Sequence, residues 1–315
     1  MGSTQFPGDS LPSNQSLERL VRIVGVVLAV LLVVFAGFYY WDRYIHVGDM
    51  SPVELGINHM ERAVRENPDD LGMRLTLVQY YLENGDNTSA LEQVQQVLSA
   101  YPDNEGALFL SGIAYTNLAR HEEAIQALEK FAGLRRTAED PQLDKVLEAS
   151  LYFLGENYLD LGRLPEAIQV LNEAIGLDPT DADAKNLLGN AYANAGQHEQ
   201  AIQSYEDAVR FVPDFSEAYQ GMFESYTALS MTAYLPYAKG MEAYSAQDYS
   251  SARQYLEQAV DGLPQYAPAF LGLGLTYERQ GEIRLAEESL KKTLNLDPGN
   301  VLASTALARI QAANQ

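Results

Sequence analysis

Few side chains in this chain have the type and spacing that catalysis or metal binding requires. The chain has no cysteine, and its four histidines are scattered: His46, His59, His121 and His198. Zinc sites are built from His and Cys ligands clustered at short spacings, and the sequence contains no such cluster. Acidic pairs such as Glu122 and Glu123 fit the solvated face of a helix. We therefore predict no catalytic residue, no metal site, no cofactor and no enzymatic activity.

Phosphate-binding chemistry is also disfavoured. Gly272 and Gly274 form a glycine pair, but they lie inside an apolar helical pattern and not in a strand-to-helix turn that could hold a phosphate. The chain carries 21 basic and 43 acidic residues, a net charge of −22, so its surface repels nucleic acid. Two interpretations of this charge stay open. It could be a solvated acidic exterior that keeps the protein in solution, or a dedicated site for a basic partner.

A repeated pattern dominates the rest of the sequence. Proline recurs at one phase with spacings of 34, 77, 34, 51 and 34 residues, and glycine, tyrosine and alanine keep step with it. The prolines are Pro68, Pro102, Pro179, Pro213, Pro264 and Pro298. A fixed period near this length indicates an array of stacked helical hairpins. In each unit, small residues let two helices approach closely and proline ends the second helix.

One segment carries the full pattern and allows a comparison with a known family. The stretch AKNLLGNAYANAGQHEQAIQSYEDAVRFVPD resembles the tetratricopeptide repeat (TPR) consensus at Leu188, Gly189, Tyr192, Gly196, Ala201, Tyr205, Ala208 and Pro213. The resemblance extends over about residues 51–315, with units at 71–104, 105–138, 148–181, 182–215, 233–266 and 267–300. It implies an all-α fold, a solenoid of TPR helical hairpins, and we expect one transmembrane helix before it.

The predicted organisation follows from this register. It consists of a disordered tail at 1–19, a transmembrane helix at 20–41, a linker and N-terminal cap helix at 42–70, four units at 71–215 with an insertion near 139–147, an extra helix at 216–232, two units at 233–300 and a C-terminal cap helix at 301–315. The cap helix should begin at Ser51, with Pro52 at the first helical position and Glu54 as the reciprocal capping partner.

Two departures from the period predict local changes. The insertion offers Asp140 as an N-cap and Pro141 as the first helical position, which should lengthen the first helix of the next unit. The excess of 17 residues between Pro213 and Pro264 is half a repeat and therefore one unpaired helix. An odd helix should reverse the alternation of inner and outer rows, so we expect a kink or subdomain break near residues 231–236.

A long apolar segment precedes the repeats. Residues 23–41 carry no charge, and 19 residues at 1.5 Å rise can just cross a hydrocarbon core of about 30 Å. Aromatic residues at its end suit a membrane interface, and Arg19 and Arg22 on the N-terminal side favour a cytoplasmic N-terminus. We therefore predict a single-pass membrane protein, in contact with the lipid bilayer through residues 20–41, with periplasmic or cell-surface repeats. A cleaved secretory signal is the alternative.

The resemblance also implies where partners bind, which in this family is mainly the concave row on the first helix of each unit. That row consists of Phe109, Ile113, Tyr152, Phe153, Asn186, Asn190, Asn194, Tyr237, Met241, Tyr244, Leu271 and Leu275. Aromatic side chains in a groove can anchor a peptide or a helix. The alternative is that individual members only pack against neighbouring helices. The row has almost no Lys or Arg, so we do not carry over the carboxylate-clamping activity of some TPR modules.

Together these features predict a scaffold for protein–protein interaction. It would bind partner proteins or peptides, including basic segments and apolar helices, through the concave TPR surface, and serve in the assembly or organisation of a membrane or envelope complex. The alternative is a permanent structural subunit of a membrane complex whose transmembrane helix contacts the partners. Nucleic acid is excluded as a partner by the charge.

Overall fold

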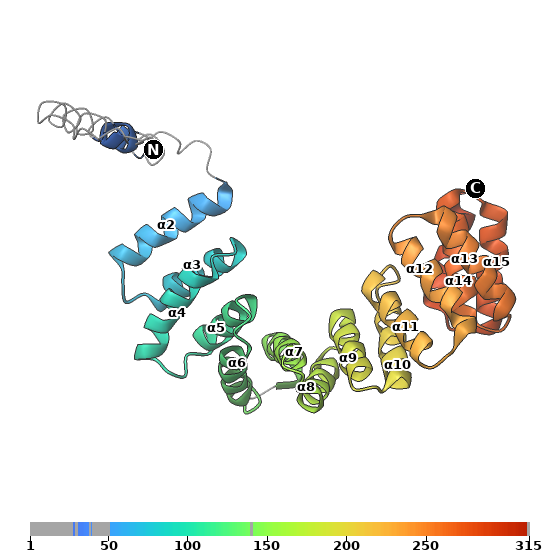
Figure 1. The fold of residues 1–315 in the computed structure, drawn as a ribbon, viewed down its shortest axis with the longest axis horizontal. Coiled ribbons are helices and arrows are strands. Elements are labelled where there is room, and N and C mark those ends of the chain that lie inside the picture. Colours follow the sequence, from blue (N-terminus) through green and yellow to red (C-terminus); the bar gives the residue numbers. More distant parts are fainter. Residues whose placement is uncertain (1–27, 29–30, 38, 40–50, 139–140, 314–315) are drawn as a thin grey trace, which may run out of the picture. The chain divides into compact units, whose positions relative to one another are not determined.

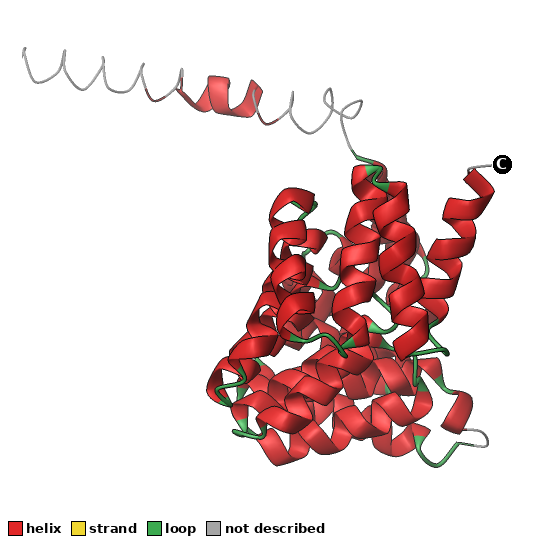
Figure 2. Ribbon diagram, turned by 90° about the vertical axis from the view of Figure 1, so that its right-hand side faces the viewer, coloured by secondary structure: helices red, strands yellow, loops and turns green. Residues whose placement is uncertain are grey.

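The structure is a computed structural model that describes residues 28, 31–37, 39, 51–138 and 141–313. Within these residues every regular element is a helix and none is a strand (Figure 2). The prediction of an all-α repeat fold is confirmed. The chain divides into two compact units, residues 1–73 and 74–315, and the boundary falls inside helix α3 (Leu71–Glu83).

In the first unit, helix α2 (Pro52–Glu66) begins as the sequence predicts. The Ser51 Oγ accepts a hydrogen bond from the Glu54 backbone N–H at 3.2 Å, and the Glu54 carboxylate accepts one from the Ser51 N–H at 2.7 Å. Pro52 occupies the first turn, where a missing N–H costs no helical hydrogen bond. This capping box satisfies two backbone donors that would otherwise lack a partner.

The membrane assignment is a prediction that the structure corrects. Across the part of the chain that it describes, no helix is both long and apolar enough to cross a bilayer. Of the segment 20–41 only residues 28, 31–37 and 39 are described, and the rest, including the flanking arginines, lies outside the described residues. The single-pass location, its topology and the contact with lipid are therefore withdrawn.

The second unit is a series of antiparallel helical hairpins (Figure 1). Each predicted repeat contains one hairpin, made of a first helix and a second helix. The pairs are α3 with α4 (Asn87–Ala100), α5 (Glu105–Asn117) with α6 (His121–Arg135), α7 (Lys145–Asp160) with α8 (Leu164–Leu177), α9 (Ala182–Asn194) with α10 (His198–Val209), α12 (Leu235–Ser245) with α13 (Tyr249–Gly262), and α14 (Ala267–Gln280) with α15 (Ile283–Leu296). Helix α16 (Val301–Ala313) packs against α15 and α14.

One contact recurs in each of five hairpins and explains the glycine period. A glycine on the first helix faces a large side chain 16 residues later on the second helix, so close that an added Cβ would lie 2.4–2.9 Å from it. The pairs are Gly112 with Leu128, Gly155 with Leu171, Gly189 with Tyr205, Gly240 with Leu256, and Gly274 with Leu290. Real Cβ atoms do not approach this closely, so any larger residue would push the two helices apart.

The insertion before α7 lengthens this helix as predicted, but the N-cap residue of α7 is Asp144. The 3₁₀ turn η2 (Pro141–Leu143) precedes α7, and Asp144 caps it by accepting hydrogen bonds from the Val146 and Leu147 N–H groups, each at 3.0 Å. Helix α7 has 16 residues, whereas α5 and α9 have 13 each, so the first helix is indeed longer. The predicted cap, Asp140, lies outside the described residues.

The 17-residue excess forms the unpaired helix α11 (Ser216–Ala228), followed by the 3₁₀ turn η3 (Thr232–Tyr234). Helix α11 contacts α9 as a first helix would, and it also packs against α10 and α12. The expected subdomain break is absent, because residues 74–315 are one compact unit and one buried apolar cluster runs from Ala182 to Ile310. The predicted reversal of the inner and outer rows remains a prediction, and one cleft is lined by the second helix α10 together with α11, α12, α14 and α16.

Candidate partner-binding surface

The twelve predicted binding residues lie on five first helices, but their exposure differs. Asn194 is exposed. Seven residues are half-buried: Phe109, Ile113, Tyr152, Phe153, Asn186, Asn190 and Leu271. Four are buried: Tyr237, Met241, Tyr244 and Leu275. The row therefore has accessible members in its first part and mostly core members after α11, although four of the five later residues still border a cleft.

The aromatic members of the first part form a small cluster between α5 and α7. The Phe109 ring lies 5.3 Å from the Phe131 ring and 6.4 Å from the Phe153 ring, and the Tyr152 ring is 5.6 Å from that of Phe153. Burial raises the pKa of Tyr152 to about 12, so this phenol is neutral at physiological pH. The Phe109 and Phe153 rings join one hairpin to the next, and both residues, like Tyr152, stay partly exposed.

A polar cleft of about 490 Å³ follows, between α7, α9 and α11. We call it the amide cleft, and it is lined by Leu159, Asp160, Asn190, Ala193, Asn194, Tyr205, Glu217, Gln220, Gly221 and Glu224. It contains three carboxylates and no lysine or arginine. The Asn190 Oδ1 accepts a hydrogen bond from the Tyr205 hydroxyl at 2.8 Å, which orients the amide.

Tyr205 is the side chain that shapes the amide cleft. Added Cβ atoms at Gly189 and Gly221 would meet its ring at 2.4 and 2.3 Å, so the ring is held between α9 and α11. On α9, the Asn186 Oδ1 is buried and has no hydrogen-bond partner among the described residues.

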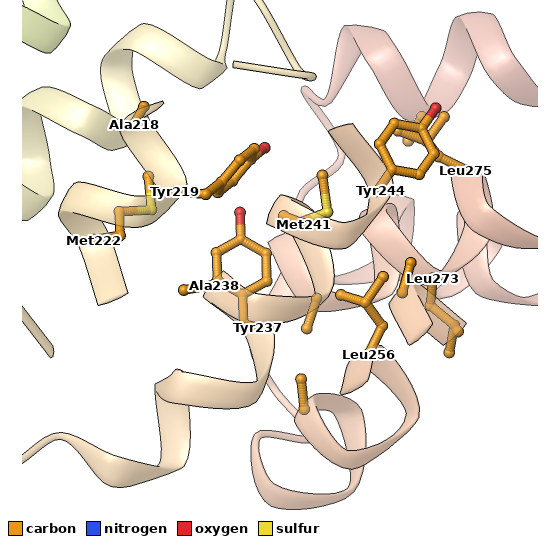
Figure 3. Close-up of a cluster of buried hydrophobic side chains, with 14 of the residues drawn as sticks. Ala218, Tyr219, Met222, Tyr237, Ala238, Met241, Tyr244, Leu256, Leu273 and Leu275 are labelled. Atoms are coloured by element: carbon orange, nitrogen blue, oxygen red, sulfur yellow. The ribbon is translucent and has the colours of Figure 1, made fainter. Parts of the chain in front are cut away.

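A second cleft, of about 510 Å³, lies between α10 and α16. We call it the tyrosine cleft, and it is lined by Glu206, Val209, Arg210, Pro213, Tyr219, Tyr237, Met241, Tyr266, Pro268, Leu271, Gly272, Leu275, Asp297, Gly299, Asn300, Val301 and Leu302. Figure 3 shows Tyr219 and Tyr237 pointing toward one another beside Met241. Tyr219 and Tyr237 are only 2% and 3% exposed, so they form the floor of the cleft.

Five tyrosine rings are connected around this floor. The Tyr237 ring lies 6.0 Å from the Tyr219 ring and 5.1 Å from that of Tyr266, both edge to face. Tyr234 stacks on Tyr226 at 5.0 Å and meets Tyr266 edge to face at 5.2 Å. Such ring pairs contribute about 0.5–1.5 kcal/mol each beyond the area that they bury. The cluster fills the position where α11 interrupts the period.

Glu206 is the charged residue at the edge of this cluster. Its Oε1 accepts a hydrogen bond from the Tyr266 hydroxyl at 3.0 Å, although the two residues are 60 positions apart in sequence. Burial raises the pKa of Glu206, and the hydrogen bond from Tyr266 opposes that rise. The Tyr226 hydroxyl is close enough to interact electrostatically with Glu206 and Tyr266, yet it makes no hydrogen bond of good geometry.

The search for binding residues along the first helices missed Glu206, because it lies on the second helix α10. A signal was present in the sequence. Ile202 and Val209, four residues before and three after Glu206, both pack against the apolar core, so helical periodicity puts the carboxylate at the margin of the apolar face. Among the described residues, no group of three or more His, Cys, Asp or Glu side chains could hold a metal ion.

Comparisons with known proteins give the family. Sequence profiles described as tetratricopeptide repeat match residues 75–142, 152–214 and 243–310. A curated relative, Protein bimA of Emericella nidulans, is 23% identical over 115 residues, which are 36% of this chain and 12% of that protein. The chain therefore matches only a small part of the length of this relative.

The chain is also similar to solved structures. The crystal structure of MamA is 27% identical, with a TM-score of 0.44, and the match covers 59% of this chain and 94% of MamA. A tetratricopeptide repeat protein from Parabacteroides merdae is 16% identical, with a TM-score of 0.48 and coverages of 86% and 97%. Because the repeat profiles match most of the helical hairpins described above, the chain belongs to the tetratricopeptide repeat family.

Proposed function

We propose that this protein is a scaffold that binds a segment of a partner protein along the faces of its first helices, and that it acts in the assembly or organisation of a protein complex. TPR proteins generally mediate protein–protein interactions, and the two clefts give this chain accessible surface for the same purpose. The observation that carries the proposal is the amide cleft of about 490 Å³, which residues of the first helices α7 and α9 and of helix α11 line.

The chemistry of this surface suits a polypeptide segment. The amide cleft offers side-chain amides and carboxylates, which can pair with the N–H and C=O groups of an extended chain. The tyrosine cleft offers an apolar floor where a side chain can be buried. Both clefts carry more acidic than basic residues, as the whole chain does with its net charge of −22. This surface therefore suits a basic partner.

The proposal is tested by placing charge at the rim of the amide cleft. Partners recovered with the full-length chain would be identified by mass spectrometry and purified, and their affinity measured for wild type and for the double variant Asn194→Arg, Gln220→Arg. Both positions are exposed, so the fold should tolerate them. We expect at least a tenfold loss of affinity, because two long cationic side chains would fill the cleft.

The matched control is Gln95→Arg, Gln126→Arg, which makes the same chemical change at exposed positions of the second helices α4 and α6. It should bind like wild type. If the two double variants bind a purified partner equally well, the first-helix surface is not the binding face and the proposal is wrong. Resistance of the complex to a high-salt wash would indicate a permanent subunit, and loss of the partner would indicate a transient one.

A further inference from the structure

We propose that the tyrosine cleft takes a lysine or arginine side chain from the partner segment, with the Glu206 carboxylate as its counter-ion, beside an apolar side chain that rests on the cleft wall. This inference rests on the proposed function and specifies the chemistry of the segment that the scaffold recognises. Four features of the cleft support it: an unpaired carboxylate, aromatic walls, an apolar half and an excess of negative charge.

The first feature is the Glu206 carboxylate, whose negative charge has no cationic partner within 4 Å among the described residues. Glu206 is half-buried, and within the described chain it has no ion-pair partner. The hydrogen bond from the neutral Tyr266 hydroxyl is the one contact of good geometry to its oxygens, although an ionised carboxylate has about four acceptor sites. A charge held away from water is costly unless it is paired. A cation entering the cleft would supply the missing partner.

The lining cation of the cleft does not fill this role. Arg210 is four residues from Glu206 on α10, and its Nη2 instead lies 3.2 Å from the Asp207 Oδ1. Its side chain is 72% exposed, so water screens its attraction for the Glu206 carboxylate, with which it forms no ion pair. Asp297 adds a second carboxylate to the lining. The cleft therefore has two acidic residues and one basic residue, Arg210, which already pairs with Asp207.

The aromatic walls suit the same ligand. Tyr266 is half-buried and forms the accessible part of the ring cluster next to Glu206, whereas Tyr219 and Tyr237 lie beneath it. The face of a tyrosine ring attracts an ammonium or guanidinium group, by about 0.5–2 kcal/mol depending on its exposure to water. A carboxylate and an aromatic ring on one wall together favour a cation over a neutral side chain of similar size.

The other wall of the cleft is apolar and accounts for the second side chain. Met241, Leu271, Leu275 and Val301 contribute to this wall from three helices. Val301 is 72% exposed, so a bound apolar side chain can cover it. The segment that fits therefore places a basic residue next to an apolar one, so that both walls are satisfied together.

The experiment is a selection of peptides followed by a double-mutant cycle. A phage-displayed library of random linear 12-residue peptides would be selected in parallel on the purified full-length wild type, Glu206→Gln and the control Glu199→Gln. The control makes the same change at an exposed glutamate of the same helix. Glutamine keeps an acceptor for the Tyr266 hydroxyl, so Glu206→Gln should fold, and thermal unfolding monitored by circular dichroism would verify this.

We expect the peptides selected on wild type and Glu199→Gln to be enriched in lysine or arginine next to an apolar residue, and this enrichment to disappear on Glu206→Gln. For the best peptide, replacing its basic residue by norleucine should lower affinity tenfold or more on wild type and less than twofold on Glu206→Gln. Because norleucine alters only the peptide, the loss on wild type tests the need for a charge even if the glutamine variant fails to fold.

The outcomes separate the two proposals. The cation site is wrong, and the scaffold function stands, if the selected peptides lose affinity for the Asn194→Arg, Gln220→Arg variant but show no preference for a basic residue. The same conclusion follows if replacing the basic residue by norleucine lowers affinity for Glu206→Gln as much as for wild type. If no peptide binds and purified partners are insensitive to the rim variant, the scaffold function fails and the cation site fails with it.

Discussion

The amide cleft and the tyrosine cleft both contain residues of first helices, yet these residues differ in how accessible they are. In the amide cleft the first-helix residues Asn190 and Asn194 are half-buried and exposed, and they contribute polar groups to an open surface. In the tyrosine cleft the first-helix residues Tyr237 and Met241 are each 3% exposed and belong to the core. The same row of the repeat is thus surface in one place and packing in the other.

The unpaired helix α11 accounts for this difference. A regular hairpin contributes one first helix and one second helix, whereas α11 adds a further helix that packs against both α10 and α12. Its Tyr219 and Tyr226 meet Tyr237 and Tyr234 across the interruption. Residues that would face the groove in a regular array are covered there, so a position in the repeat does not by itself establish accessibility.

The strongest test of this contrast is truncation of one residue in each cleft. Tyr237→Ala should lower the free energy of unfolding by about 3–5 kcal/mol, because it removes a buried aromatic ring and leaves a cavity. Asn194→Ala should change it by no more than about 0.5 kcal/mol, because the side chain is exposed. Urea unfolding monitored by circular dichroism measures both. Equal small effects would mean that the tyrosines are not core residues.

A second comparison removes one hydroxyl from each cleft. Tyr266→Phe deletes the hydrogen bond to the Glu206 carboxylate and should cost about 1.5–3 kcal/mol, the range for bonds to charged groups. Tyr205→Phe deletes the bond to the neutral Asn190 amide and should cost about 1 kcal/mol. Urea unfolding again gives the values, and a larger cost for Tyr205→Phe would reverse the assignment of the charged contact.

The first of these variants also has a titration readout. The hydrogen bond from Tyr266 lowers the pKa of Glu206 against the upward effect of burial. Tyr266→Phe should therefore raise the pKa of Glu206 further, which an NMR titration of the glutamate side-chain carbon would detect. An unchanged pKa would show that the phenol does not interact with the ionised form.

The smallest expected effect is on the pH dependence of stability, through Glu148 on α7, a helix that also lines the amide cleft. Burial, with a hydrogen bond to Asp181 and its negative charge, raises the pKa of Glu148 on α7 to about 7. The folded pKa lies above the ordinary glutamate value of about 4.5, so the native state binds more protons between these values and stability falls as pH rises through the window.

Glu148→Gln should remove the part of this pH-dependent loss of stability that Glu148 causes. We expect a change of less than about 1 kcal/mol, because the carboxyl is partly solvated. Thermal unfolding at pH 4.5 and pH 8 would compare this variant with wild type and with Glu199→Gln, whose carboxylate is exposed. A wild-type difference that Glu199→Gln removes and Glu148→Gln retains would contradict the assignment.

Much of the fold could be predicted because it follows from local periodicity. The 34-residue spacing predicted the hairpins, and in five of the six units a glycine faces the large residue 16 positions later. The capping box at Ser51 and Glu54 was readable from four adjacent residues. The cap of α7 was misplaced because Asp140 and Asp144 both precede plausible helical starts, and the sequence does not show which one the neighbouring hairpin accommodates. Arg135 Nε lies 2.5 Å from the Asp144 Oδ2, a contact that appears only once α6 and α7 are packed.

The candidate site was less predictable. The sequence indicated the row of first helices, but Tyr237 is buried against Tyr219 of α11, and Glu206 lines the tyrosine cleft beside Tyr266, which lies 60 residues away in sequence. The amphipathic pattern of α10 distinguishes apolar from polar faces. This pattern does not show which of the polar residues beside the apolar face will be covered by a helix that is distant in sequence.

What the sequence by itself determined is the repeat, the helical hairpins, the family resemblance and the acidic character, since each depends on residues within one period or on composition. The membrane helix that it also predicted was not upheld in the described residues. Only the tertiary structure decided which members of the row are accessible, where the two clefts lie and that Glu206 borders one of them, because exposure depends on helices that are distant in sequence and adjacent in space.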